Sequence, residues 1–401
     1  MRIAVFTDND FNKVNGVTTT LRALLRWAPA DLQIRIYTAD DRGVDEPQYY
    51  SRRAPGAAIP FYRGMNLYYP PLWAYLRQLR RDRIELIHLT TPGPVGIAAL
   101  FSAWRLQLPM VGSFHTDLAT YTTLLSRSRL LGRIVGRYVR WPYGRCERVL
   151  VPSQATGTAL SRAGVAPGKH VLWQRGVDPE SFSPARRSVS LRLRWRALSD
   201  TTVVMYVGRI SREKNLDAFA AVEERLIRSG RPYRMVFVGD GPMHAELQAR
   251  FPGAILTGSV PHGDVGEYLA SADVFAFPSR TDTAGNVVLE AQAAGLPVVV
   301  GDEGGPRENV WPGRSALVTS ARDDQSFAAA VERLVCDSSL RAAMAAEARA
   351  LALTRDWRAA LAPLFATYRQ TIADHAAVTT NLVPAATVDQ SLLAESLHDL
   401  S

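Results

Sequence analysis

The sequence predicts an α/β protein made of two Rossmann-like domains, each with a doubly wound parallel sheet, that face each other across a cleft. Short apolar, strand-like segments alternate with helical patterns from residue 2 to residue 176, and the alternation restarts at residue 201. Such alternation favours parallel sheets covered by helices on both faces. A length of 401 residues also suits two or three domains. The charged, proline-containing segment 176–200 therefore predicts the hinge.

The first domain is expected to span residues 1–176. Its strand-like segments are 2–7, 33–40, 85–91, 110–117, 148–153 and 170–176, and its helical patterns are 16–27, 70–81, 95–106 and 154–163. Residues 40–56 are charged and punctuated by Pro and Gly, which predicts a loop.

The second domain is expected to span residues 177–356. Its strand-like segments are 201–209, 234–242, 254–260, 272–279, 296–301 and 315–319, and helical patterns fill 322–352. A further helical pattern covers about 357–375. Residues 376–401 mix apolar and polar side chains without a clear period and are expected to be mobile.

Charge and composition indicate which kinds of partner the protein binds. The net charge is +9, but residues 1–180 hold 24 Lys/Arg against 13 Asp/Glu (+11), whereas the remainder holds 23 against 25 (−2). Such asymmetry favours an anionic partner for the first half, although heavy arginine usage in the source genome would produce the same excess. A nucleic-acid-binding protein is the weakest reading, because the basic residues are not interleaved with aromatic ones.

The cysteines and the N-terminus favour a cytoplasmic protein. Cys146 and Cys336 lie far apart in sequence, which indicates a reducing compartment and no zinc site. No apolar segment follows Met1, so no signal peptide is expected. The chain also lacks the G-x-x-x-x-G-K-[ST], G-x-G-x-x-G and G-x-S-x-G motifs.

The strongest candidate site is the stretch 277–300, FPSRTDTAGNVVLEAQAAGLPVVV, which is typical of a strand, loop, helix and second strand. Ligands bind outside the carboxyl ends of parallel strands. The backbone N–H groups of residues 285–288 then form an anion site at the start of the helix. Asp282 and Glu290 flank this site. Surface charge or interaction with the helix dipole is the alternative role for each carboxylate.

Other polar groups fall at predicted strand ends. Gly16 begins a helix after the first strand and permits close approach of a ligand. Arg209 and Lys214 follow the strand 201–209 and suit a diphosphate, although two solvated loop cations would look the same in isolation. His115 ends a strand of the first domain and is a candidate site residue. His88 lies within its strand and is expected to be packed.

Three motifs resemble the retaining family 4 glycosyltransferases of GT-B fold. They are G-R-x-x-x-x-K (208–214), G-D-G-P (239–242) and S-x-T-D-T-x-G-N-x-x-L-E-A (from Ser279). The segments FHTD (114–117), RCERVLVPS (145–153) and WQRGVD (173–178) are similar to the subgroup of bacterial α-mannosyltransferases and sulfolipid or glycolipid synthases. The resemblance covers roughly residues 1–375.

The resemblance implies roles for individual residues. Arg209 and Lys214 would bind the donor diphosphate and stabilise the leaving group, Glu290 would bind the ribose, Asp282 would hold the sugar, and His115 would contact it near the anomeric centre. Further donor-binding residues would be Gly16, Val17, Gly208, Val260, Gly285, Asn286, Val287 and Val288, with Asp117 and Tyr121 on the acceptor side. Cationic side chains take the place of a metal, so a metal-independent reaction without a cofactor is expected. The helix 357–375 would pack back on the first domain.

The chain departs from the family pattern at three positions. Asp282 replaces the usual Glu, Ala284 replaces Phe and Gln292 replaces Met. The expected donor is GDP-mannose, with a UDP-hexose (glucose, GlcNAc or a related sugar) as the alternative. The expected acceptor is a lipid or glycan, with a soluble acceptor as its variant. A nucleotide-sugar-binding protein without turnover is the alternative from another class.

The segment 124–145 predicts contact with an anionic membrane. Arg133, Arg137 and Arg140 share one helical face, whereas Ile134 and Tyr138 tend to another. This pattern is compatible with an interfacial helix on the inner face of the plasma membrane. An ordinary amphipathic helix packed on a sheet fits the same pattern.

Overall fold

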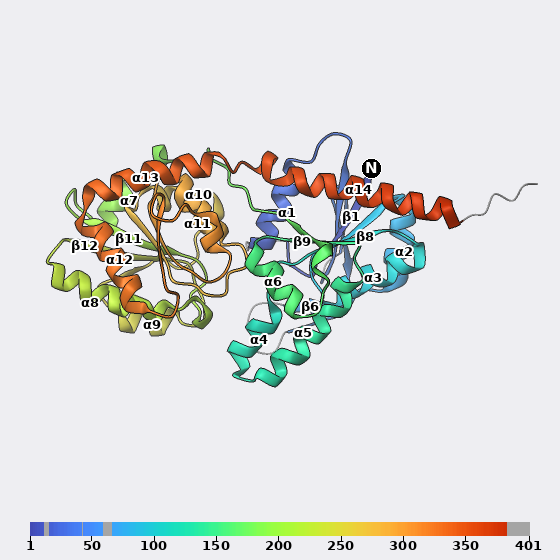
Figure 1. Ribbon diagram of the computed structural model, residues 1–401, viewed down its shortest axis with the longest axis horizontal. Coiled ribbons are helices and arrows are strands. Elements are labelled where there is room, and N and C mark those ends of the chain that lie inside the picture. Colours follow the sequence, from blue (N-terminus) through green and yellow to red (C-terminus); the bar gives the residue numbers. More distant parts are fainter. Residues whose placement is uncertain (12–15, 42, 59–65, 383–401) are drawn as a thin grey trace, which may run out of the picture.

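A computed structural model describes residues 1–11, 16–41, 43–58 and 66–382 and shows two lobes, each built on its own sheet (Figure 1). The first lobe holds an eight-stranded sheet of order β10-β9-β8-β7-β1-β2-β4-β3, and the second a six-stranded sheet of order β13-β12-β11-β14-β15-β16. Every strand pair in these two sheets is parallel except β3 with β4. The prediction of two Rossmann-like parallel sheets is therefore confirmed.

The sheet of the first lobe follows the apolar segments of the sequence. Its strands are β1 (Arg2–Phe6), β2 (Gln33–Asp40), β3 (Val44–Glu46), β4 (Tyr49–Arg53), β7 (Leu86–Leu89), β8 (Met110–Ser113), β9 (Arg148–Val151) and β10 (His170–Leu172). A separate antiparallel pair joins β5 (Gly56–Ala58) and β6 (Asn66–Tyr68). The helices are α1 (Gly16–Arg26), α2 (Leu72–Arg81), α3 (Pro94–Leu106), α4 (Leu118–Ser126), α5 (Arg129–Gly144) and α6 (Gln154–Arg162).

The central strand β1 shows why the lobe has three layers. Ile3 and Val5 are buried in a core with residues of α1. Ala4 and Phe6 are buried in a second core on the opposite face, with residues of α2 and α3. A strand that is apolar on both faces must be covered twice, which helices between parallel strands achieve.

The expected loop 40–56 is wrong. Residues 44–46 and 49–53 form β3 and β4, which extend the sheet beyond β2 at its edge. Edge strands tolerate charged side chains because one side of the ladder faces solvent. The charges that suggested a loop are therefore compatible with this position.

Three further boundaries differ from the prediction. The strand expected over 110–117 ends at Ser113, and Asp117 instead caps α4 by accepting a hydrogen bond from Thr120 N. The strand expected over 254–260 is limited to residues 255–256. The helical region 322–352 is divided at Asp337, whose side chain caps the second of its two helices.

The second lobe repeats the arrangement with shorter connections. Its strands are β11 (Thr202–Val207), β12 (Tyr233–Val238), β13 (Ile255–Leu256), β14 (Val274–Phe277), β15 (Val298–Gly301) and β16 (Ala316–Thr319). Its helices are α7 (Val189–Arg194), α8 (Phe219–Ser229), α9 (His244–Arg250), α10 (His262–Ala270), α11 (Asn286–Ala293), α12 (Asp324–Cys336) and α13 (Ser338–Leu353).

Two chain segments cross side by side between the lobes. Val177 N donates to Arg355 O at 2.8 Å. A Cβ on Gly176 would lie 2.7 Å from Trp357 Cα, so only glycine fits this crossing. The lobes are therefore connected by two chain segments, at residues 176–177 and 355–357, rather than by a single linker.

The last helix, α14 (Trp357–Leu382), returns along the first lobe (Figure 1). Leu361, Leu364 and Tyr368 are buried in the core that contains α1 and β1. The helix continues past the expected end at residue 375, and residues 383–401 of the expected tail lie outside the described residues. Within the described part of the chain, no helix is long and apolar enough to cross a membrane.

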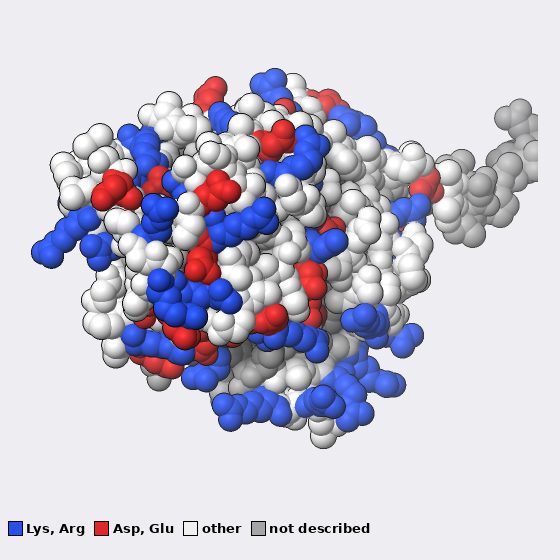
Figure 2. Space-filling view, turned by 60° about the vertical axis from the view of Figure 1, so that its left-hand side comes forward, with Lys and Arg blue, Asp and Glu red and all other residues white. Residues whose placement is uncertain are grey.

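The first lobe also carries a projection formed by α4 and α5, which pack on each other below its sheet (Figure 1). Figure 2 shows Lys and Arg side chains gathered on this lower part of the molecule, with few acidic side chains beside them. A cluster of positive charge thus lies on the lower part of the face seen in this view.

Candidate active site

The centre of the site is the loop that joins β14 to α11. Gly285 occupies the left-handed region with φ of 65°, and a Cβ at this position would lie 2.9 Å from Pro306. The loop can therefore turn into α11 only at a glycine. The side-chain oxygen of Asn286, the first residue of α11, is buried without a hydrogen-bond partner in the described structure. This end of α11 thus has unmet polar groups and the positive end of a helix dipole.

Lys214 and Asp282 form a close ion pair at this loop. Lys214 Nζ lies 2.8 Å from both carboxylate oxygens of Asp282, and the two side chains are 12% and 22% exposed. Burial lowers the pKa of Lys214, but the adjacent carboxylate outweighs this effect and leaves the pKa above its ordinary value. Lys214 is therefore a permanent cation, 5.9 Å from the centre of the Phe277 ring.

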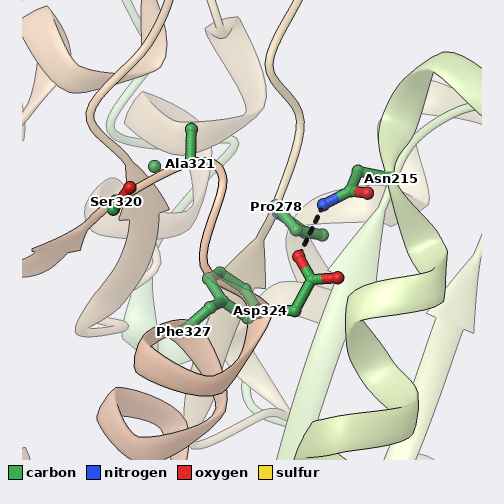
Figure 3. A pocket seen from close by; sticks show the side chains of 7 residues that line it. Asn215, Pro278, Ser320, Ala321, Asp324 and Phe327 are labelled. Atoms are coloured by element: carbon green, nitrogen blue, oxygen red, sulfur yellow. Dashed lines mark hydrogen bonds between the residues drawn. The ribbon is translucent and has the colours of Figure 1, made fainter.

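The backbone around Lys214 is held by a second set of contacts. The next residue, Asn215, has φ of 55° and donates from Nδ2 to Asp324 Oδ1 at 3.2 Å (Figure 3). Arg280 also reaches Asp324, at 3.4 Å. The cavity beside this contact has a volume near 10 Å³, about one water. This cavity is too small for a sugar or a nucleotide. The contacts of Asn215 and Arg280 with Asp324 therefore position the loops that carry Lys214 and Asp282.

Glu290 lies on α11, one turn beyond the anion site. Its side chain makes no hydrogen bond or ion pair with any described residue, and burial raises its pKa to about 7. A largely buried carboxylate without a partner is costly. Hydroxyl groups of a bound ligand would supply the missing donors.

Gly16 and Arg209 approach the same region from the two lobes. A Cβ on Gly16 would lie 3.8 Å from Asn286 Nδ2, so the start of α1 faces the start of α11. Arg209 follows β11 and is partly buried, and its carbonyl accepts a hydrogen bond from Tyr206 Oη at 3.0 Å. Gly208 has φ of 152°, where a Cβ would lie 2.8 Å from the same hydroxyl.

His115 is the end of a buried relay of hydrogen bonds. Its Nδ1 lies 3.1 Å from a guanidinium nitrogen of Arg175, and its Nε2 lies 2.8 Å from Ser113 Oγ. The same hydroxyl lies 2.8 Å from His88 Nε2, and His88 Nδ1 lies 2.6 Å from Tyr368 Oη on α14. Because a guanidinium can only donate, His115 Nδ1 accepts and its Nε2 carries the proton.

This relay keeps His115 neutral. Burial, together with the nearby charge of Arg175, holds the pKa of His115 well below its ordinary value. Arg175 is 2% exposed, stacks 4.2 Å from the Trp173 ring, and has no carboxylate partner in the described structure. His88 is fully buried, in line with the packed role expected for it.

Thr283, next to Asp282, is held by the opposite lobe. Its hydroxyl donates to His115 O at 2.5 Å, and its carbonyl accepts from Ser153 Oγ at 2.9 Å and from Thr156 Oγ1 at 3.1 Å. The loop that carries Asp282 is therefore positioned by residues of both lobes.

Two further contacts join the lobes. Tyr121 Oη donates to Glu213 Oε1 at 3.4 Å, beside Lys214. Glu308 accepts from Gln154 N at 2.8 Å and from Ala155 N at 2.9 Å, which are the first two N–H groups of α6. A carboxylate of the second lobe thus stabilises the positive end of a helix in the first.

The structure brings most of the expected residues together where the ends of β11 and β14 face the start of α1. Lys214, Asp282 and the start of α11 are in contact or adjacent, Gly16 faces them, and Tyr121 reaches the Lys214 loop. Val17, Val287 and Val288 lie in the first turns of α1 and α11. Asp117 is occupied as the N-cap of α4. Val260 packs against the core of the second lobe.

Sequence reasoning did not single out Arg175, Ser153, Thr156 or Glu308. Ser153 and Arg175 stand inside the motifs VPS and WQRGVD, so the motifs were a signal, but no spacing connected Glu308 to α6. Within the described ranges, no group of three or more His, Cys, Asp or Glu side chains could hold a metal ion.

Comparison with known proteins gives a consistent result for both halves. Residues 14–181 match the model of "Glycosyltransferase Family 4", and residues 201–337 match that of "Glycosyl transferases group 1". The boundary between the two matches falls where the chain passes from one lobe to the other.

Individual relatives cover most of the chain. It is 31% identical over 365 residues to a GDP-mannose-dependent alpha-mannosyltransferase of Mycobacterium tuberculosis, covering 89% of this chain and 93% of the relative. It is 30% identical over 370 residues to the sulfoquinovosyl transferase SQD2 of Arabidopsis thaliana, covering 90% and 71%. The structure of the Anabaena protein HepE in complex with UDP and glucose aligns with a TM-score of 0.72 at 19% identity, covering 92% of this chain and 100% of that one.

Proposed function

This chain belongs to the family 4 glycosyltransferases, retaining enzymes of GT-B fold that transfer a sugar from a nucleotide sugar, and we propose that it transfers mannose from GDP-mannose to a lipid or glycan acceptor. The observation that carries the proposal is the ion pair of Lys214 with Asp282 at the loop before α11, with the buried carboxylate of Glu290 on the same helix.

The polar groups of the candidate active site match the parts of a nucleotide sugar. Lys214, Arg209 and the N–H groups at the start of α11 suit a diphosphate, because each places positive charge where phosphate oxygens would lie. Glu290 has no partner among the described residues and suits the two hydroxyls of a ribose. Asp282 offers carboxylate oxygens for sugar hydroxyls while Lys214 holds it in place.

The reaction then depends on charge stabilisation. Breakage of the bond between the sugar and the diphosphate leaves negative charge on the departing phosphate oxygen. The Lys214 cation, Arg209 and the dipole of α11 stabilise that charge, and their effect grows when the lobes exclude water. The acceptor hydroxyl attacks on the face from which the phosphate leaves, as retention of configuration requires, and no metal is needed.

His115 acts through its placement in this proposal. Both ring nitrogens are hydrogen bonded within the first lobe, and its carbonyl holds Thr283 beside Asp282. We assign His115 to the sugar side of the cleft, where a neutral ring packs against the donor without adding positive charge near the oxocarbenium-like centre.

The choice of GDP-mannose rests on the 31% identity to a GDP-mannose-dependent enzyme over nearly all of its length. A UDP-hexose is the alternative donor. The chain is almost as similar to a sulfoquinovosyl transferase, so the identity alone does not fix mannose as the sugar. The loop 282–284 decides between them in this proposal, since it is tied to both lobes and departs from the family pattern.

The exposed face of α5 supports a lipid-linked acceptor on an anionic membrane surface. Leu130, Ile134, Tyr138 and Trp141 are 61, 55, 43 and 42% exposed and recur along one side of the helix. The opposite side of α5 buries Val139 and Tyr143 in the core of the first lobe, as in an ordinary amphipathic helix, so the membrane proposal rests on the exposed stripe alone. Such a stripe flanked by arginines suits the cytoplasmic surface of a bilayer.

A donor screen tests the activity. Purified protein is incubated with GDP-mannose, UDP-glucose or UDP-GlcNAc, with and without a chelator, and nucleotide release and thermal stabilisation are measured. Release of GDP from GDP-mannose that survives the chelator is expected. Binding of a nucleotide sugar without any turnover would instead favour a non-catalytic binding protein, and a Lys214→Met variant that still turns over would contradict the assigned role.

The membrane contact is tested separately by flotation with vesicles. Binding to phosphatidylglycerol vesicles, weaker binding to phosphatidylcholine vesicles and loss of binding at high salt are expected. A protein that floats with neither vesicle would have a soluble acceptor.

A further inference from the structure

A groove lies at the C-terminal end of α5, outside the candidate active site. It has a volume near 450 Å³. Its lining contains four cations and an indole, and the rest is small or apolar: Arg137, Arg140, Trp141, Gly144, Arg145, Gly164, Val165, Ala166 and Lys169. No acidic side chain lines it.

Two of the cations have no partner. Arg137 and Arg140 make no hydrogen bond and no ion pair with any described residue, although they stand three positions apart on the same helix, where like charges repel. A Cβ on Gly164 would lie 2.9 Å from Arg140 Cδ, so the stem of this arginine passes over Gly164. Two exposed guanidinium groups at the rim of an open groove, without a counter-ion among the described residues, favour an anionic ligand.

The other two cations cover the negative end of the helix dipole. Lys169 Nζ donates to Gly144 O at 2.7 Å and to Cys146 O at 2.9 Å, and Arg145 donates to Trp141 O at 3.1 Å. The carbonyl groups that would repel an anion are thus already hydrogen bonded. Arg145 also lies 5.0 Å from the Trp141 ring centre, which orients the indole.

The groove is separate from the donor site. Gly144 and Lys169 precede β9 and β10, so the groove lies at the amino ends of these strands, whereas Ser153 and the other site residues follow their carboxyl ends. A four-residue strand such as β9 is about 13 Å long. A ligand in the groove therefore does not touch the donor.

We propose that this groove binds a phosphate group, carried by an anionic phospholipid headgroup or by a soluble phosphate ester. Arginine is suited to phosphate because its planar fork donates two parallel hydrogen bonds. The headgroup is the favoured source, because the groove continues the exposed stripe of Leu130, Ile134 and Trp141, and an indole at the edge of such a stripe suits the headgroup level of a bilayer. This proposal stands apart from the donor chemistry.

Calorimetric titration of the full chain tests the proposal with three soluble probes. They are dihexanoyl phosphatidylglycerol below its micelle concentration, glycerol 1-phosphate, and dihexanoyl phosphatidylcholine as the lipid without net charge. The groove variant is Arg137→Gln with Arg140→Gln. The matched control is Arg129→Gln with Arg133→Gln, which removes the same charge nearer the other end of α5.

We expect phosphatidylglycerol to bind, with affinity at least tenfold weaker in the groove variant and within twofold of wild type in the control. Binding of phosphatidylglycerol without glycerol 1-phosphate identifies the headgroup source, and equal binding of both identifies a soluble ester. The proposal is overturned if neither phosphate probe binds the wild type, if phosphatidylcholine binds equally well, or if both variants lose affinity to the same degree. Thermal unfolding and GDP-mannose turnover of each variant show that the fold and the donor site are intact.

Discussion

Replacement of Glu290 by Gln tests two effects of this carboxylate: the stability that the protein loses by burying its charge, and the donor affinity that the charge provides. The side chain lies on α11 without a partner, and burial raises its pKa from 4.5 to about 7. Glutamine keeps the shape and removes the charge. We expect the variant to be more stable than the wild type at pH 8 and to bind the donor more weakly.

The magnitude follows from the pKa. A change from 4.5 to about 7 corresponds to roughly 3 kcal/mol, and partial contact with solvent reduces this to about 1–3 kcal/mol. Between these pH values the folded chain holds a proton that the unfolded chain has released. This contribution is therefore favourable at low pH and is lost as the pH rises through about 7. Each kcal/mol corresponds to about 2–4 °C in the melting temperature of a domain of this size.

The assay is calorimetric melting of both proteins at pH 5 and pH 8, with titration of GDP and GDP-mannose at each pH. The variant should melt several degrees higher at pH 8 and close to the wild type at pH 5. Loss of a charged hydrogen bond to ribose should weaken binding about tenfold to a hundredfold. Wild-type affinity should rise between pH 5.5 and 7.5, because the ionised carboxylate accepts both hydroxyl protons, and the variant should lack this rise.

Two results would refute this reasoning. A variant that melts lower than the wild type at pH 8 would show that the Glu290 carboxylate is stabilised by contacts that the structure lacks. Unchanged nucleotide affinity would show that Glu290 does not bind the ribose.

Three further predictions concern the remaining contacts of the site. Asp282→Asn should destabilise the protein by roughly 2–4 kcal/mol, because it leaves Lys214 as a buried unpaired cation. A Lys214→Met, Asp282→Leu double variant should recover part of that stability, as measured by chemical denaturation, but should have no turnover. Arg175→Met should raise the pKa of His115 and mix its tautomers, visible in ¹⁵N spectra of the imidazole and as a new acidic limb in the pH profile of kcat/KM, whereas Arg175→Lys should restore much of the wild-type behaviour. Glu308→Gln should weaken the contact between the lobes by about 0.5–2 kcal/mol, seen as a longer mean distance between labels on the two lobes and a raised KM for the donor with little change in kcat; an unchanged distance would contradict that role.

The strand-end argument accounts for the part of the site that could be predicted. Lys214 and Asp282 follow β11 and β14, which are neighbours in one parallel sheet, so their loops meet at the same edge. That adjacency follows from alternating strands and helices alone. The strands β3 and β4 could not be recognised, because charged side chains are equally compatible with a loop and with the border of a sheet.

Contacts between residues far apart in sequence could not be predicted from the sequence. Nothing in the local pattern around Arg175 indicates that it donates to His115, sixty positions earlier. The same holds for Glu308 at the start of α6 and for Tyr368 on α14, which meets His88 across the first lobe. Each pairing depends on how a lobe or a returning helix is placed.

The sequence by itself determined two parallel sheets, the glycine-opened helix with its flanking carboxylates, and the family, because these depend on local periodicity and on residues close together in the chain. Only the tertiary structure decided which groups are satisfied and which are left open. It joined Lys214 to Asp282, enclosed His115 in a relay, left Glu290 without a partner among the described residues, and turned one apolar stripe of α5 towards solvent. These outcomes depend on burial and on distances between segments, which packing sets and which no spacing in the sequence encodes.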